Sequence, residues 1–158
     1  MLELTRLKCK EIRNHRYPKE QWPGTIYQNA LMENSSAERV LLEIGCGREA
    51  KTLNRVSNHY KSSIGIDMEH PHAVHNGFHF IRADAHYLPL ESESVDIIAM
   101  NDVVEHLADP QTVFRECARV LRPQGRLIVL TVNKWFMPIL MGRVFPHRLR
   151  QIVNRMAT

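Results

Sequence analysis

Short apolar runs, each closed by glycine, proline or polar residues, recur along the middle of the 158-residue chain. The runs fall at residues 40–44, 63–67, 77–82, 94–100 and 125–132. The first run is typical of a strand that is buried on both faces of a sheet, and the third alternates, with Phe78 and Phe80 on one face of a predicted strand. Between the first two runs, Ala50, Leu53 and Val56 recur at helical spacing, and residues 54–61 are expected to close that helix. Strands that alternate with helices predict an α/β fold with a mostly parallel sheet.

A second helix is predicted between the last two runs. It begins at Asp109-Pro110, because Asp is a favoured N-cap and proline is favoured at the first helical position. Its apolar stripe is expected to comprise Val113, Phe114, Cys117, Ala118, Val120 and Leu121. Residues 122–125 then form a predicted turn before the fifth strand. Right-handed crossovers and a reversal after the third strand predict a doubly wound, Rossmann-like sheet with strand order 3-2-1-4-5.

The sequence Gly45-Cys46-Gly47 directly follows the first apolar run. Glycines allow the chain to turn sharply, and they allow a ligand to lie against bare backbone. A strand, a glycine turn and a helix form the first half of a nucleotide-binding βαβ unit. The ligand is therefore expected at the carboxyl ends of the parallel strands.

Two carboxylates lie beside this predicted ligand edge. Glu43 is inside the end of the first strand, where a carboxylate is costly unless a cationic ligand or ordered donors pair with it. Asp67 ends the second strand, at the position that meets the ribose hydroxyls of an adenosine. Residues 45–50 also match a dinucleotide fingerprint with alanine in the last place, so an NAD(P)-binding oxidoreductase is an alternative.

An ordered set of motifs from about residue 39 to about residue 132 resembles the class I S-adenosylmethionine-dependent methyltransferases. The set comprises Leu42-Glu-Ile-Gly-Cys-Gly47, Gly65-Ile-Asp67, Arg82-Ala-Asp-Ala85, Leu88-Pro-Leu90, Ser94-Val-Asp-Ile-Ile98, Glu105-His-Leu107 and Val120-Leu-Arg-Pro-Gln-Gly-Arg-Leu127. The resemblance implies S-adenosylmethionine as cofactor and direct displacement of its methyl group onto a small-molecule acceptor. The cofactor-binding residues it implies are Glu43, Gly45, Cys46, Gly47, Asp67, Met68, Asp84, Ala85 and Asn101.

In that family, the acidic residue at position 84 accepts a hydrogen bond from the adenine amino group; the alternative role for Asp84 is a turn cap. Met68 is expected to pack on adenine, and Glu43 to order the ammonium end of the cofactor. Glu49 stands where the family usually has glycine, and a side chain there is expected to crowd the methionine end. His106 is near the site in sequence, but no catalytic residue is assigned. A non-catalytic methyltransferase-like binding module is therefore a second alternative.

Composition bears on the binding partners, the cellular compartment and metal binding. The net charge of +4 is only mildly basic, so no nucleic-acid partner is expected. Cys9, Cys46 and Cys117 form no paired framework, and the charged N-terminus does not resemble a signal peptide, so a cytoplasmic protein is expected. No metal site is expected, although four histidines fall in one loop, because no recognised ligand spacing accompanies them. Those histidines are His70, His72, His75 and His79.

Three regions are expected: an N-terminal extension or cap at residues 1–38, an S-adenosylmethionine-binding domain at 39–133, and an apolar, then basic, tail at 134–158. The tail is interpreted as a lid or edge cover in preference to a segment that contacts a membrane surface. The resembled fold normally adds two further strands, so the sheet is expected to be abbreviated or the chain to be a fragment. An uncovered fifth strand would favour a homodimer.

Overall fold

The computed structural model describes residues 22–72 and 77–132. The chain divides into two compact units, of which Pro23–Thr131 is one. The other joins Met1–Trp22 to Val132–Thr158, and almost all of it lies outside the described residues. The tail expected at 134–158 is therefore not described, nor is any role it has as a lid, edge cover, membrane contact or dimer interface. The domain boundaries remain a prediction.

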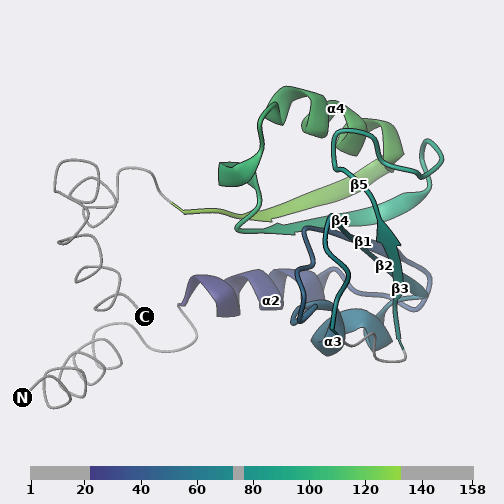
Figure 1. The fold of residues 1–158 in the computed structure, drawn as a ribbon. Coiled ribbons are helices and arrows are strands. Elements are labelled where there is room, and N and C mark those ends of the chain that lie inside the picture. Colours follow the sequence, from purple (N-terminus) through teal and green to yellow (C-terminus); the bar gives the residue numbers. More distant parts are fainter. Residues whose placement is uncertain (1–21, 73–76, 133–158) are drawn as a thin grey trace, which may run out of the picture. The chain divides into compact units, whose positions relative to one another are not determined.

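A five-stranded sheet forms the centre of the unit Pro23–Thr131, with strand order β3-β2-β1-β4-β5 (Figure 1). Every neighbouring pair of strands is parallel. The doubly wound order predicted from the sequence is confirmed. The strands span Val40–Ile44 (β1), Ser62–Asp67 (β2), His79–Arg82 (β3), Val95–Asn101 (β4) and Leu121–Leu130 (β5).

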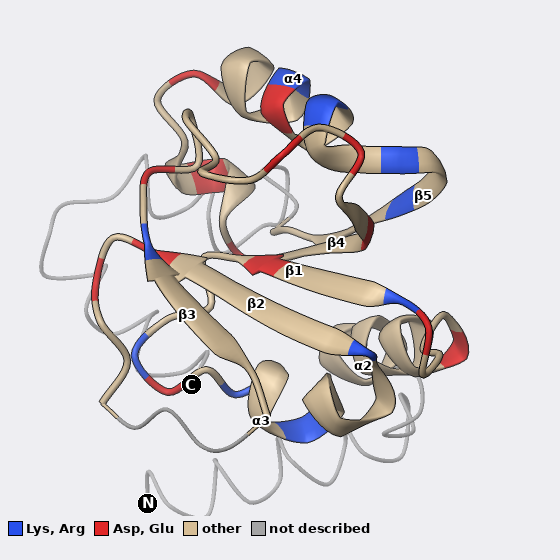
Figure 2. Ribbon diagram, turned by 90° about the vertical axis from the view of Figure 1, so that its right-hand side faces the viewer, with Lys and Arg blue, Asp and Glu red and all other residues tan. Residues whose placement is uncertain are grey.

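Helices cover both faces of the sheet. α2 (Pro23–Glu33) and α3 (Leu53–Val56) lie on one face, and α4 (Pro110–Val120) lies on the other (Figure 2). Successive side chains of a strand point to opposite faces, so each strand contributes to two separate cores. Leu41, Ile97 and Ala99 pack with α2 and α3, whereas Leu42 and Ile98 pack with α4.

α4 begins as its sequence predicts. The Asp109 side chain accepts hydrogen bonds from the amides of Gln111 and Thr112, and Pro110 occupies the first turn. Of the predicted stripe, Val113, Cys117 and Val120 are buried, and Leu121 is half-buried as the first residue of β5. Phe114 and Ala118 are exposed, so the stripe is narrower than predicted.

The helix after the glycine turn is much shorter than its spacing predicts. α3 contains only Leu53–Val56, and a 3-10 turn at Ser57–His59 follows it. Ala50 has a φ of 42°, which lies outside the right-handed helical region. The prediction that the helix includes Ala50 is therefore wrong. Ala50 fits the apolar spacing of α3, but it belongs to the turn that precedes this helix.

Several strand boundaries also differ from the prediction: β2 and β4 by one residue, and β3 and β5 by more, with β5 ending at Leu130 and not at the predicted residue 132. β3 begins at His79, two residues later than expected, although Phe78 is buried and Phe80 packs on the same core. β5 begins at Leu121, before the predicted turn. Leu121 pairs with Val95 and Arg126 with Ile97, so residues 122–125 form an irregularity within the strand.

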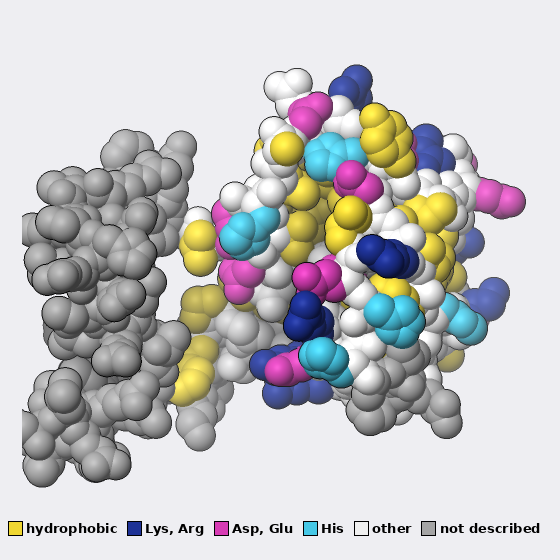
Figure 3. Space-filling view, in the orientation of Figure 1, with side chains coloured by type: hydrophobic (Ala, Val, Ile, Leu, Met, Phe, Trp, Pro, Cys, Tyr) yellow, Lys and Arg dark blue, Asp and Glu magenta, His cyan; other side chains and the backbone are white. Residues whose placement is uncertain are grey.

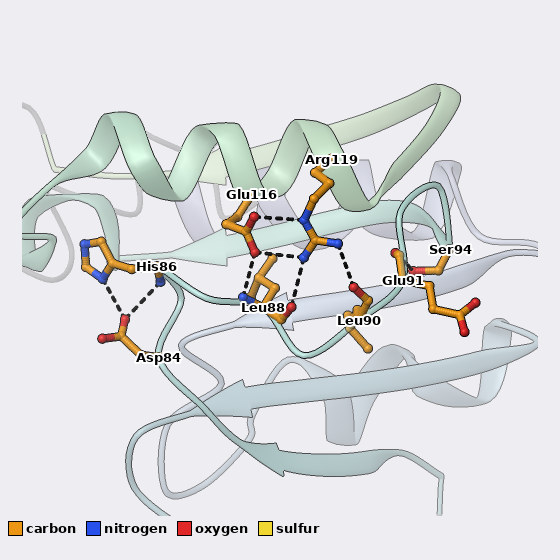
Figure 4. Close-up of polar contacts among 8 residues, drawn as sticks. All are labelled: Asp84, His86, Leu88, Leu90, Glu91, Ser94, Glu116 and Arg119. Atoms are coloured by element: carbon orange, nitrogen blue, oxygen red, sulfur yellow. Dashed lines mark hydrogen bonds and ion pairs between the residues drawn. The ribbon is translucent and has the colours of Figure 1, made fainter.

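An ion pair on α4 fixes the segment between β3 and β4 (Figure 4). Glu116 accepts from the Leu88 amide at 2.8 Å and from Arg119 at 2.8 Å. The Arg119 guanidinium also donates to the carbonyl oxygens of Leu88, at 2.9 Å, and Leu90, at 2.8 Å. Arg119 holds the pKa of Glu116 at about 2. This network ties the backbone that follows Asp84 to the helix.

Candidate functional site

A cavity of about 310 Å³ opens at the carboxyl ends of β1 and β4. Its walls are residues 45–52, together with Glu43 from β1 and Asn101 from β4. Strand order reverses between these two strands, since β1 leads to β2 on one side and β4 leads to β5 on the other. Ligands of open α/β sheets bind at such a switch point. The cavity therefore lies at the edge that the sequence predicts.

The two glycines of the turn have different structural roles. Gly45 and Gly47 both have left-handed backbones, with φ of 71° and 67°. A Cβ on Gly45 would collide with Cγ2 of Val103, so this glycine is needed for packing. A Cβ on Gly47 would meet no atom within 4 Å among the described residues. Gly47 therefore leaves bare backbone beside the open space of the cavity.

Glu43 places a buried carboxylate against this cavity. It is only 2% exposed, and its Oε2 atom has no hydrogen-bond partner among the described residues. Burial raises the pKa of Glu43 to about 7, although hydrogen bonds from the Thr52 hydroxyl and the Leu53 amide act to lower it. A buried acceptor of this kind is costly until a donor pairs with it.

Asn101 contributes a second unpaired acceptor to the same side of the sheet. Glu43 pairs in register with Ala99, and Asn101 lies two residues further along β4, so the Glu43 and Asn101 side chains share the α2 and α3 face. The Asn101 Oδ1 atom is buried and has no partner in the described part of the chain. Two unpaired acceptors at one cavity fit a ligand group with several N–H donors, such as an ammonium.

Asp67 ends β2 and joins it to the glycine turn. Its Oδ2 accepts from the Gly47 amide at 2.8 Å, and its Oδ1 accepts from the Glu69 amide at 2.9 Å. A carboxylate oxygen can accept more than one hydrogen bond, so both oxygens can still receive ligand hydroxyls. The predicted contact of Asp67 with a ribose is compatible with this geometry and stays a prediction.

The residues predicted to contact adenine do not line the cavity. Met68 is 58% exposed. The Asp84 carboxylate accepts from the amide and from Nδ1 of His86, at 2.9 and 2.6 Å, and these bonds lower its pKa (Figure 4). Ala85 is half-buried against the α4 core. The turn-capping role of Asp84 is thus observed, and the adenine-binding role of these three residues stays a prediction.

Cys46 and Glu49 also line the cavity. Cys46 is buried between the turn and β2, and burial raises the pKa of its thiol to about 12, so it acts as a neutral wall of the cavity. The Glu49 carboxylate is exposed and pairs with Lys51 at 2.7 Å. Although Glu49 contributes to the cavity wall, its charged end is directed to Lys51.

Sequence reasoning assigned no site role to two residues at or beside the cavity. Thr52 lines the cavity and hydrogen-bonds Glu43, and Tyr27 of α2 is buried in the same core as Cys46 and Ala50. Neither belongs to a motif. Thr52 is identified by its hydrogen bond to a buried carboxylate, and Tyr27 by its burial in a core that includes residues of the cavity wall. Both properties appear only in the folded chain.

Other candidate chemistry is weaker. His106 is exposed in the 3-10 turn Val104–His106 and is not among the residues that line the cavity. Within residues 22–72 and 77–132, no group of three or more His, Cys, Asp and Glu side chains could hold a metal ion, and His75 lies outside these ranges. In the same residues, no helix has both the length and the apolar character needed to cross a membrane.

Comparison with known proteins agrees with this geometry. Residues 42–129 match a family model described as a methyltransferase domain. A probable S-adenosylmethionine-dependent methyltransferase of Mycolicibacterium smegmatis is 33% identical over 114 residues, which cover 69% of this chain and 43% of the relative. The mitochondrial ubiquinone biosynthesis O-methyltransferase of Homo sapiens is 30% identical over 130 residues, covering 73% of this chain and 34% of the relative. The crystal structure of the YcgJ protein from Bacillus subtilis has a TM-score of 0.62 at 24% identity, covering 75% of this chain and 56% of that one.

The chain spans less than half the length of these curated relatives. The family match nevertheless covers more than half of the 158 residues, and it includes the glycine turn, Asp67 and the whole of β4. The solved structure supports the fold, in agreement with the observed strand order. The chain therefore belongs to the class I S-adenosylmethionine-dependent methyltransferases.

Proposed function

We propose that this chain holds the cofactor site of an enzyme that transfers the methyl group of S-adenosylmethionine to a small-molecule acceptor. The observation that carries the proposal is the unpaired Oε2 atom of Glu43, buried at the carboxyl end of β1 beside the cavity. A carboxylate in that place calls for a ligand with N–H donors or a positive charge. The α-ammonium group of S-adenosylmethionine provides both.

The residues that would hold the cofactor follow the cavity and the strand ends. Glu43 and Asn101 would accept hydrogen bonds from the ammonium group. Gly47 would let the methionine part lie against the backbone of the turn, and Asp67 would accept from the ribose hydroxyls. Met68, Asp84 and Ala85 would contact adenine, as the family resemblance implies.

Bound S-adenosylmethionine supplies a methyl group on a sulfonium that is already activated for displacement. The work of the chain is therefore to bind and orient it, which can account for a large part of a rate enhancement. The short turn of residues 45–52 and the rigid ends of β1 and β4 suit this role, because they fix the cavity wall on the central strands of the sheet. A dedicated base is needed only when the acceptor must lose a proton.

Three observations support a small-molecule acceptor. One relative is named a ubiquinone biosynthesis O-methyltransferase, and ubiquinone is a small molecule. Acidic and basic side chains are interspersed on the face in Figure 3, which gives no continuous basic surface there for a phosphate backbone. The net charge is only +4.

The free, buried thiols of Cys46 and Cys117 support placing this activity in the cytoplasm.

Transfer of label from methyl-labelled S-adenosylmethionine tests the proposal. Incubation with a panel of phenolic and carboxylic small molecules should label one of these classes, whereas DNA, RNA and unrelated protein should stay unlabelled. Label in a nucleic acid would contradict the acceptor class. Cofactor binding with no transfer to any acceptor would favour the non-catalytic binding module, and binding of NADH in place of the cofactor would favour the oxidoreductase.

A further inference from the structure

Three buried side-chain polar atoms in the described residues have no hydrogen-bond partner: Tyr27 Oη, Glu43 Oε2 and Asn101 Oδ1. They come from different elements but lie on one face of the sheet. Glu43 and Asn101 project from β1 and β4 on the face that α2 covers, and Tyr27 is a residue of α2. Tyr27 is 4% exposed and belongs to the same core as Cys46 and Ala50, which line the cavity.

The three atoms require different hydrogen-bond partners. The Glu43 carboxylate and the Asn101 carbonyl oxygen are acceptors, so they call for donors. The Tyr27 hydroxyl can donate, and burial together with the nearby Glu43 charge raises its pKa, which keeps the proton on the phenol. The group that complements all three carries donors and an acceptor close together. The zwitterionic end of an α-amino acid has this composition, with an ammonium beside a carboxylate.

We propose that the Tyr27 hydroxyl donates a hydrogen bond to the carboxylate of the ligand's α-amino acid end, so that Tyr27 selects ligands that carry this group. The inference rests on the proposed function, because the methionine part of S-adenosylmethionine ends in such a group. It assigns Tyr27 to the carboxylate, and Glu43 and Asn101 to the ammonium. Tyr27 also gives α2 a direct role in the site, beyond covering the sheet.

Tyr60 provides a matched control in the same core. It is buried like Tyr27, but its hydroxyl donates to the Leu31 carbonyl oxygen at 2.6 Å. Replacing Tyr60 by phenylalanine breaks an existing hydrogen bond and leaves a carbonyl unpaired. Replacing Tyr27 by phenylalanine removes a hydroxyl that has no partner among the described residues. The same substitution therefore has opposite expected effects on the unliganded chain.

The test is calorimetric titration of the 158-residue chain with S-adenosylhomocysteine and with its decarboxylated analogue. Tyr27→Phe should weaken S-adenosylhomocysteine binding by roughly tenfold or more, the loss expected for one hydrogen bond to a charged group. It should leave the affinity for the decarboxylated analogue unchanged, and the melting temperature of the unliganded chain equal or higher. Tyr60→Phe should lower that melting temperature and leave both affinities unchanged.

Two outcomes would overturn the inference while the proposed function stands. If the wild-type chain binds S-adenosylhomocysteine and Tyr27→Phe binds it equally well, the hydroxyl does not meet the ligand. If Tyr27→Phe weakens both ligands equally, Tyr27 acts through Glu43 or through packing and not on the carboxylate. Failure of the wild-type chain to bind S-adenosylhomocysteine would instead overturn the proposed function itself.

Discussion

The backbone amide of Gly47 donates a 2.8 Å hydrogen bond to Oδ2 of Asp67, which joins the glycine turn after β1 to the end of β2. The other oxygen of Asp67 accepts from the Glu69 amide and fixes the chain where it leaves the sheet. Asp67 thus shapes the turn that forms the cavity wall. Its structural role and its proposed ribose contact can be separated by substitution.

Asp67→Asn keeps one carbonyl oxygen, which can accept from Gly47 while the contact with the Glu69 amide is lost, whereas Asp67→Ala loses both contacts. We expect Asp67→Asn to retain most of the stability and to bind S-adenosylhomocysteine roughly tenfold or more weakly, since charge-assisted hydrogen bonds to the ligand are lost. Asp67→Ala should in addition lower the free energy of unfolding by about 1–3 kcal/mol, because it leaves the Gly47 amide without this acceptor. Calorimetry and urea unfolding measure the two effects. Unchanged affinity in both variants would mean that Asp67 only holds the turn.

Gly45 and Gly47 offer a comparison within one turn. Gly45→Ala should lower the free energy of unfolding by more than Gly47→Ala does, since its methyl group would collide with the Val103 side chain in addition to straining the backbone. Gly47→Ala should cost only about 1–2 kcal/mol of stability, because the strain of a left-handed alanine is not accompanied by a collision. Its methyl group would enter the open space at the cavity, so cofactor affinity should fall. A Gly47→Ala chain with normal affinity would show that the ligand does not approach this backbone.

Glu43 should give stability and ligand binding opposite pH dependences. Burial raises its pKa from the ordinary 4.5 to about 7, so the folded chain binds a proton that the unfolded chain has released between these values. The stability of the unliganded chain should therefore be highest below pH 4.5, as far as this group is concerned, and fall by on the order of 3 kcal/mol as pH rises through 7. Affinity for an ammonium ligand should rise over the same range, because the carboxylate form binds it.

Glu43→Gln is the control for this linkage, since it preserves size and removes the titration. The variant should be at least as stable as the wild-type chain at pH 8, bind S-adenosylhomocysteine weakly, and show neither pH dependence between 5 and 8. The test is to measure the free energy of unfolding and the affinity for S-adenosylhomocysteine between pH 5 and 8 for both chains. Parallel pH dependences of stability and affinity in the wild-type chain would contradict the proposed role of Glu43.

Arg119→Met should release the segment between β3 and β4 from α4. The guanidinium donates to Glu116 and to two backbone carbonyls, so its loss should cost about 2–3 kcal/mol in the free energy of unfolding. Arg115→Met is the control, because Arg115 is exposed and its hydrogen bond goes to Thr112 on the same helix. That variant should change stability by less than about 0.5 kcal/mol. Hydrogen exchange should report faster opening at Leu88 only in Arg119→Met.

The sheet could be predicted from the sequence because each strand is a short apolar run beside a turn residue. Val40–Ile44 and Val95–Asn101 are examples, and the handedness of crossovers then fixes the order of the strands. The extent of α3 could not be predicted in the same way. Ala50 shares the apolar spacing of the helix but is held in a left-handed turn, so spacing alone assigns it to the wrong element.

The site residues that belong to local sequence motifs could be predicted. Glu43, Gly45, Gly47 and Asn101 all reach the cavity wall, and each lies at a strand end or in the turn. Tyr27 could not be assigned, because a tyrosine in a short helix carries no signal of an unpaired hydroxyl. That property depends on how α2 packs on the sheet, including β5, which is distant from it in sequence. The predicted tail at 134–158 lies outside the described residues, as does its proposed role in dimerisation.

The most direct test of the central claim is an equilibrium titration of the 158-residue chain with S-adenosylhomocysteine, beside the same titration with NADH and with Glu43→Gln as the control chain. The account predicts saturable binding of S-adenosylhomocysteine by the wild-type chain, at least tenfold weaker binding by Glu43→Gln, and no binding of NADH. Binding of NADH without S-adenosylhomocysteine, or equal affinity of both chains for S-adenosylhomocysteine, would contradict it.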